Sequence, residues 1–162
     1  MNIYDFAISK EKEAEKHYRS MIEKTEDKGL KSILSRLAEA EVRHRQIVER
    51  MKGGNSKPES AEDPILEDAK AVFEKMERSR QVPKVPADQA GLYQHSADME
   101  KESMEFYREK ARETQNESHR TVFLALADEE KKHLLLAETL VEMVTRPQTW
   151  LENAEWHHMD EY

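Results

Sequence analysis

The feature that most constrains this chain is a helical pattern that occurs twice, 89 residues apart. Residues 37–44 read LAEAEVRH, and residues 126–133 read LADEEKKH. In each copy a Glu and a His stand three positions apart, which places both side chains on one face of an α-helix. Each pair falls within an otherwise apolar stripe. The stripes are Leu30, Leu34, Leu37, Glu41, His44, Val48 and Met51 in the first copy, and Phe123, Leu126, Glu130, His133, Ala137 and Leu140 in the second.

Carboxylates in a buried stripe need a partner that neutralises them. Burying an unpaired carboxylate costs several kcal/mol, so a sequence that places one in a core seam has to compensate its charge. A bound metal ion is the usual means. The repeated pattern therefore predicts a metal site inside a helical core.

The composition predicts long amphipathic helices in a single domain. Hydrophobic residues make up 37% of the 162 residues and charged residues another 37%, with 4 Gly and 5 Pro. These proportions are typical of helices with solvated outer faces and give little indication of strands. The formal net charge of −8 argues against nucleic acid or an anionic membrane as the main partner. It suits a protein that attracts cations.

The chain contains no cysteine. This excludes structural disulfides, thiolate zinc sites, a thiol nucleophile and cysteine-ligated iron centres of the rubredoxin or iron–sulfur type. The first residues show no basic region followed by an apolar run, and no apolar stretch approaches the roughly 20 residues of a membrane span. We therefore expect a soluble, cytoplasmic protein.

Apolar periodicity and helix-breaking residues divide the chain into two helical hairpins and a crossover. The predicted long helices cover about residues 2–27, 30–52, 88–114 and 118–145, and Lys28 and Gly29 form the turn of the first hairpin. The crossover covers about residues 53–87, and in it a shorter helix follows Pro64. Residues 1–145 are thus predicted to form one bundle domain.

Shifting the first hairpin by 89 residues superimposes its polar pattern on the second. Glu11 falls on Glu100, Tyr18 on Tyr107, Glu41 on Glu130 and His44 on His133. Two equal hairpins joined by a long crossover predict an all-α four-helix bundle with an approximate two-fold axis. Each hairpin then offers one Glu from its first helix, and one Glu and one His from its second.

Four carboxylates and two imidazoles that meet in a bundle core predict a dinuclear metal site. Such oxygen and nitrogen ligands suit iron or manganese better than copper or zinc, and two divalent ions balance four Glu charges. The expected ligands are Glu11 and His44 for one metal, Glu100 and His133 for the other, and Glu41 and Glu130 as bridges.

Two tyrosines complete the repeated pattern. Tyr18 and Tyr107 each lie two helical turns after the Glu of their own helix, where a phenol can hydrogen-bond to a ligand carboxylate. Glu-x6-Tyr followed by Glu-x2-His, twice at equal spacing, resembles the ferritin-like di-iron superfamily and, within it, the rubrerythrin-like branch, over about residues 2–145. The resemblance implies a ferritin-like bundle, iron at the six positions given above, and oxidation of a di-ferrous centre by hydrogen peroxide or dioxygen.

The chain departs from the rubrerythrin pattern in two ways. Rubrerythrins carry a further Glu three residues after the third-helix ligand, whereas this chain has Ser103 there. Its ligand set is in that respect closer to bacterioferritin-type ferroxidase centres. Rubrerythrins also usually carry a rubredoxin domain, which a chain without cysteine lacks. The resemblance therefore implies electrons from a separate donor, or from ferrous iron itself.

Residues 146–162 are predicted to form a separate aromatic tail. Pro147 ends the fourth helix, and Thr149 with Glu152 forms a capping box that opens a short tail helix. Trp150 and Trp156 are expected to dock this helix on the bundle or on another subunit.

The tail also contains a third Glu-x2-His, formed by Glu155 and His158. No upstream Glu pairs with it, so we interpret it as a chance match. The other histidines outside the repeated pattern are expected at the surface. They are His17, His95, His119 and His157.

The sequence thus favours an oxidoreductase that reduces hydrogen peroxide or dioxygen with two iron ions per subunit, for which manganese or zinc can substitute. Its expected role is oxidative-stress defence or iron handling, with an external electron donor. Two alternatives are a ferroxidase or iron-storage protein, for which ferrous iron is the substrate, and a metal-stabilised structural bundle without turnover. We expect a homodimer or a higher homo-oligomer, and the long crossover also allows helices to be exchanged between subunits.

Overall fold

The computed structural model describes residues 2–54 and 61–153, and these residues form six α-helices and no strand. The helices are α1 (Ile3–Lys24), α2 (Lys28–Lys52), α3 (Ile65–Ser79), α4 (Ala90–Glu113), α5 (Glu117–Thr145) and α6 (Pro147–Asn153), with a 3-10 turn at Ala87–Gln89. The predicted all-α, ferritin-like architecture is confirmed. No helix within these ranges is long and apolar enough to cross a membrane.

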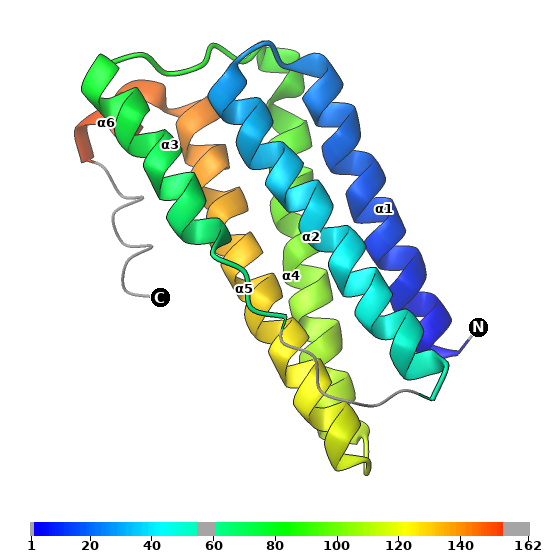
Figure 1. The fold of residues 1–162 in the computed structure, drawn as a ribbon. Helices are drawn as coiled ribbons and strands as arrows, with labels where there is room; N and C mark the ends of the chain where they lie inside the picture. Colours follow the sequence, from blue (N-terminus) through cyan, green and yellow to red (C-terminus); the bar gives the residue numbers. More distant parts are fainter. Residues whose placement is uncertain (1, 55–60, 154–162) are drawn as a thin grey trace.

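Four long helices, α1, α2, α4 and α5, lie side by side and make the bundle (Figure 1). α1 packs against α2 and α4 against α5, so both predicted hairpins are formed. α3 lies outside the four, against α2 and α5, and leads to the end of the bundle from which α4 starts (Figure 1). The crossover therefore runs along the length of the bundle, because α2 ends at one end of it and α4 starts at the other.

The turn of the first hairpin lies at residues 25–27, so its predicted place at Lys28 and Gly29 is wrong. Asp27 explains the difference, because its Oδ1 accepts a hydrogen bond from the Leu30 N–H at 2.8 Å and caps α2. Gly29 lies in the first turn of α2, where a Cβ would come within 2.9 Å of Val72 Cγ1 on α3. This glycine marks a close approach between two helices.

The tail helix α6 starts earlier than the sequence predicted. It begins at Pro147, so the capping box at Thr149 does not open it. Proline is favoured at a first helical position, because the N–H that it lacks has no intrahelical acceptor there. Trp150 of α6 is buried and stands edge-on to Phe73 of α3, with ring centroids 5.3 Å apart. The predictions for Glu155, Trp156, His157 and His158 lie outside the described residues.

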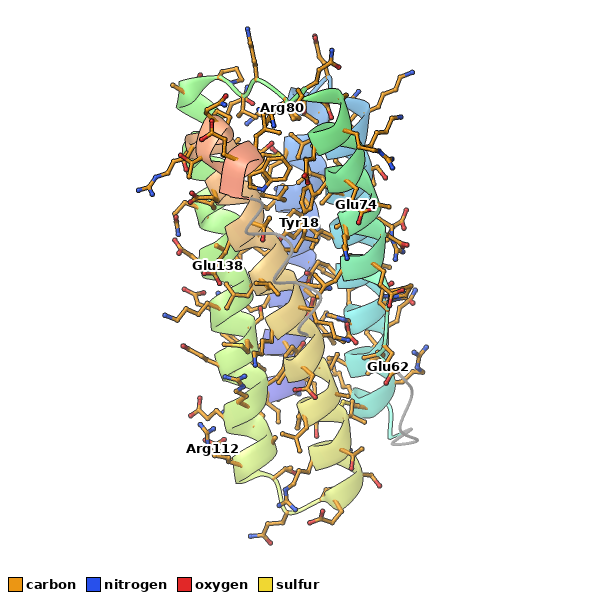
Figure 2. The ribbon with its side chains drawn as sticks, turned by 90° about the vertical axis from the view of Figure 1, so that its left-hand side faces the viewer. Tyr18, Glu62, Glu74, Arg80, Arg112 and Glu138 are labelled. Atoms are coloured by element: carbon orange, nitrogen blue, oxygen red, sulfur yellow. The ribbon has the colours of Figure 1, made fainter. Side chains whose placement is uncertain are left out.

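Two apolar clusters fill the bundle, and every long helix contributes to both. The first includes Met21, Leu34, Leu37, Phe73, Leu136 and Trp150, and the second includes Ala7, Val48, Tyr107, Phe123 and Leu126. Figure 2 shows Tyr18 inside the bundle, whereas Arg112 and Glu138 point outward. Along each long helix, the residues between its two apolar segments form a third layer, which is polar.

A buried aspartate fixes the crossover to the bundle. Asp63 lies two residues before α3 and is 6% exposed. Its Oδ1 accepts a hydrogen bond from Arg36 Nη2 at 2.6 Å, and its Oδ2 accepts one from Arg43 Nη2 at 2.7 Å. Burial by itself raises the pKa of Asp63, but the two guanidinium groups of α2 outweigh it and hold this pKa below its usual range.

We expect Asp63→Asn to lower the free energy of unfolding by about 2 kcal/mol, because two charge-assisted hydrogen bonds lose their anionic acceptor. Urea unfolding followed by circular dichroism measures this change. Asp68→Asn is the matched control, since Asp68 binds the same Arg36 at 2.8 Å but is 54% exposed. The control should cost less than about 0.5 kcal/mol. Equal losses in the two variants would contradict an anchoring role for Asp63.

Candidate metal centre

Six side chains from the four long helices meet in the polar layer. They are Glu11 of α1, Glu41 and His44 of α2, Glu100 of α4, and Glu130 and His133 of α5. Each of them is at most 1% exposed. All six residues that the sequence selected as candidate ligands are thus brought together, and each comes from the helix on which its stripe placed it.

The two histidines contact carboxylates across the bundle. His44 Nδ1 lies 2.8 Å from Glu130 Oε1, and His133 Nδ1 lies 3.3 Å from Glu41 Oε1. The two imidazole rings are stacked, with centroids 5.2 Å apart and planes 7° from parallel. Each histidine therefore faces the Glu of the opposite Glu-x2-His pair, as the approximate two-fold axis requires.

The candidate ligand atoms fall into two overlapping groups of four. In each group, one atom from every residue lies within 4.8 Å of the others. One group is Glu11, Glu41, His44 and Glu130, and the other is Glu41, Glu100, Glu130 and His133. Glu41 and Glu130 belong to both groups, which is the arrangement that bridging carboxylates between two neighbouring metals need.

The repeated tyrosines hydrogen-bond to carboxylates of the opposite hairpin. The Tyr107 hydroxyl donates to Glu11 Oε1 at 2.7 Å, and the Tyr18 hydroxyl donates to Glu100 Oε1 at 2.8 Å. Burial, together with the negative carboxylates, raises the pKa of both phenols well above its ordinary value. Both tyrosines therefore keep their protons and act as donors.

Burial also changes the protonation of the carboxylates. Desolvation raises the pKa of Glu11, Glu41 and Glu130 above the ordinary carboxyl value. Burial would raise the pKa of Glu100 as well, but the neighbouring Glu130 carboxyl group and the charge of His133 lower it to about 2. Three of the four carboxyl groups are thus more readily protonated than an exposed carboxyl group when no cation is bound.

The imidazoles respond in opposite directions. Desolvation and the neighbouring His133 lower the pKa of His44 to about 3. Desolvation also disfavours charge on His133, but Glu100, whose Oε2 lies 3.5 Å from His133 Nδ1, outweighs it and raises the His133 pKa. These shifts favour charge on Glu100 and His133, which face each other, and the neutral form of His44.

The donor atoms of this layer fit a pair of metal ions. Glu11 Oε2, Glu100 Oε2 and Glu130 Oε2 are buried and have no hydrogen-bond partner among the described residues. Buried polar atoms without partners are rare in folded proteins and point to a ligand that completes them. Four carboxylates with two imidazoles suit iron or manganese, whose charge would replace the protons and satisfy these oxygens.

Two histidines that were expected at the surface are half-buried instead. His17 Nε2 lies 2.9 Å from the Leu92 carbonyl oxygen and 3.1 Å from Ser96 Oγ, so His17 joins α1 to α4. His119 Nδ1 lies 3.0 Å from the Tyr4 hydroxyl. His95 is exposed, as predicted. The periodicity of a single helix could not reveal these contacts, because the partners come from another hairpin.

A buried carboxylate beside the centre was not selected from the sequence. Glu129 is 2% exposed, and its Oε1 accepts a hydrogen bond from Lys132 Nζ at 3.2 Å. It precedes Glu130 directly, so it lies on a different face of α5 and outside the apolar stripe. A run of two acidic residues gives no sign of which one is buried.

Comparison with known proteins agrees with this geometry. The rubrerythrin family model matches residues 2–141, which include all six candidate ligands and both tyrosines. No curated protein and no solved structure matched the chain in the corresponding comparisons. Rubrerythrin family members are di-iron oxidoreductases, and the family typically binds a di-iron centre. The chain, with its buried layer of Glu and His, belongs to the rubrerythrin family.

Proposed function

We propose that this protein binds two iron ions in the polar layer and reduces hydrogen peroxide or dioxygen there. One observation carries the proposal: four Glu and two His converge in a buried layer, and three of their oxygens accept no hydrogen bond from the described residues. Glu11 and His44 would hold one ion, Glu100 and His133 the other, and Glu41 and Glu130 would bridge them. A bound ferrous pair supplies the two electrons and the Lewis acidity that cleavage of a peroxide bond needs.

The chain's own residues position the ligands. Tyr107 and Tyr18 each hold one terminal carboxylate by a hydrogen bond from the other hairpin, which leaves the second oxygen free to bind. The apolar clusters on both sides keep water out and strengthen every charge interaction in the layer. This arrangement supports redox chemistry of a small oxidant and provides no protein nucleophile.

Electrons for repeated turnover would come from a separate partner. The chain has no cysteine and hence no rubredoxin-type centre of its own. Ser103, where rubrerythrins have a further Glu, favours a second candidate, a ferroxidase in which incoming ferrous iron is itself the donor. A metal-stabilised bundle without turnover is the third reading. Rapid reoxidation of the reduced centre would support one of the two enzymatic functions and argue against a bundle without turnover.

The first test is metal content. We expect about two iron ions per chain in protein purified without chelator, and loss of both in the double variant Glu41→Ala/Glu130→Ala, because each metal loses its bridging ligands. Inductively coupled plasma mass spectrometry measures the iron. The matched control is Glu39→Ala/Asp128→Ala, which removes two exposed carboxylates from the same helices at equivalent repeat positions. Absence of iron uptake by the wild type under anaerobic conditions would contradict the proposal.

Stopped-flow oxidation of the reduced, iron-loaded protein identifies the oxidant. We expect peroxide or dioxygen to oxidise both ferrous ions in one fast phase, since the two metals share Glu41 and Glu130 as ligands. If neither oxidant reacts faster with the protein than with ferrous iron in buffer, the function is structural.

The tyrosine hydrogen bonds provide a second test. We expect Tyr107→Phe to weaken iron binding by about tenfold, because Glu11 loses the donor that orients it. Anaerobic titration with ferrous iron measures the affinity. Tyr93→Phe is the control, since Tyr93 is also a buried tyrosine of α4 but belongs to the first apolar cluster. Equal affinities in the two variants would show that the Tyr107 hydroxyl only fills space.

The raised pKa of Glu41 predicts a pH-dependent stability of the metal-free protein. The folded-state pKa of Glu41 lies above the ordinary value of 4.5. The free energy of unfolding therefore falls progressively as pH rises from 4.5 towards the folded-state pKa, because Glu41 ionises more readily in the unfolded chain. Glu41→Gln mimics the protonated form. We therefore expect it to stabilise the metal-free protein more at pH 8 than at pH 5, in urea unfolding. An equal gain in the free energy of unfolding from Glu41→Gln at pH 5 and at pH 8 would contradict a raised pKa of Glu41.

A further inference from the structure

A surface cavity opens between α1 and α4, beside the polar layer. Its volume is about 290 Å³, enough for several water-sized molecules. The lining residues are Phe6, Ala7 and Lys10 of α1, and Glu102, Ser103, Glu105, Phe106, Tyr107 and Glu109 of α4. Phe6 and Phe106 form its aromatic wall, with ring centroids 5.1 Å apart. Phe6 is 40% exposed, so this wall reaches the surface.

Tyr107 connects the cavity to the candidate metal centre. Its side chain lines the cavity, and its hydroxyl donates to Glu11 Oε1 at 2.7 Å. Ser103 lies one turn from Tyr107 and one turn from Glu100 on the same helix, so it stands between the cavity and the carboxylate layer. Ala7 lies one turn before Glu11 on α1 in the same way. Two small residues and one tyrosine of the cavity lining thus lie on the helix faces that carry the candidate ligands Glu11 and Glu100.

The place related to this cavity by the repeat has different side chains. The 89-residue shift relates Phe106 to His17 and Phe6 to His95. The His17 and His95 rings pack edge-to-face with centroids 4.9 Å apart, and His17 Nε2 lies 3.1 Å from Ser96 Oγ. Two histidines, one of which hydrogen-bonds to α4, therefore occupy the place where the other side of the α1–α4 seam has the two phenylalanines that border the cavity.

We propose that this cavity is the route by which a small neutral oxidant reaches the centre, and that Ser103 sets its width. This inference rests on the proposed function and specifies the access side and the residue that controls it. The aromatic wall and Ala7 suit an uncharged molecule of the size of dioxygen or hydrogen peroxide. Three glutamates and one lysine among the lining residues give the opening a net negative charge, which disfavours anionic oxidants.

Access can be measured without metal. Dissolved dioxygen is paramagnetic, so it accelerates the nuclear relaxation of side chains that it reaches. In the metal-free protein we expect the Ala7 methyl group to relax faster under dioxygen than that of Ala14, another buried alanine of α1. In Ser103→Phe the Ala7 enhancement should fall to the Ala14 level, because the ring fills the cavity. Equal enhancement of Ala7 and Ala14 in the wild type would overturn the proposal.

A second experiment measures the reaction of the iron-loaded protein with peroxide. We expect Ser103→Phe to keep its iron and to slow reoxidation by peroxide by about tenfold in stopped flow. Ser103→Ala, which leaves the cavity open, should react like the wild type. An unchanged rate in Ser103→Phe would overturn the route, and slower ferrous uptake with unchanged oxidation would assign the cavity to the cation instead.

The two proposals fail in different ways. A wild type that binds no iron contradicts the proposed function, whatever Ser103 does. A wild type that binds iron and reacts quickly, with a Ser103→Phe variant that reacts equally fast, contradicts only the access route.

Discussion

The burial of four carboxylates in one layer of a helical bundle is the constraint on which the rest of this structure depends. Each carboxylate would cost several kcal/mol if it were ionised and unpaired there. Two features limit this cost when no metal is bound: three carboxyl groups have a raised pKa, which eases their protonation, and Glu100 faces His133 at 3.5 Å. The apolar clusters above and below the layer supply the folding energy that the layer itself does not.

The hydrogen bonds of the layer cross between hairpins, and this makes the site a property of the assembled bundle. Tyr18 of the first hairpin holds Glu100 of the second, and Tyr107 of the second holds Glu11 of the first. The histidines cross in the same manner. Neither hairpin can therefore present an ordered half-site alone, although each carries a complete set of one tyrosine, two glutamates and one histidine. Ordering of the ligands before metal arrives lowers the cost of binding, since the folded bundle has already restricted their motion.

The sequence predicted the bundle, the crossover helix and the six converging residues because repeat spacing and apolar periodicity report directly on helix faces. It placed the first turn at Gly29, because glycine signals both a turn and a close approach, and only the position of α3 distinguishes the two. Asp63 was not found for a similar reason: its two arginine partners lie on α2, and no local pattern links them to a residue of the crossover. What the sequence missed are contacts between segments that are far apart in the chain and carry no periodic signal.

The two hairpins differ at residues around the candidate metal centre, so the two sides of the α1–α4 seam are not equivalent. Two identical hairpins would produce two equivalent sides of the α1–α4 seam, and the metals would be approached equally from both. The candidate ligands and the tyrosines repeat faithfully, as two equivalent metal sites would require. The residues around them do not: Ser103 corresponds to the buried Ala14, and the pair Phe6 and Phe106 corresponds to the pair His95 and His17. The candidate ligand positions therefore follow the repeat, whereas several residues that line the proposed access cavity differ from their repeat counterparts. The proposed access route thus depends on residues that break the repeat, while the candidate metal centre depends on residues that keep it.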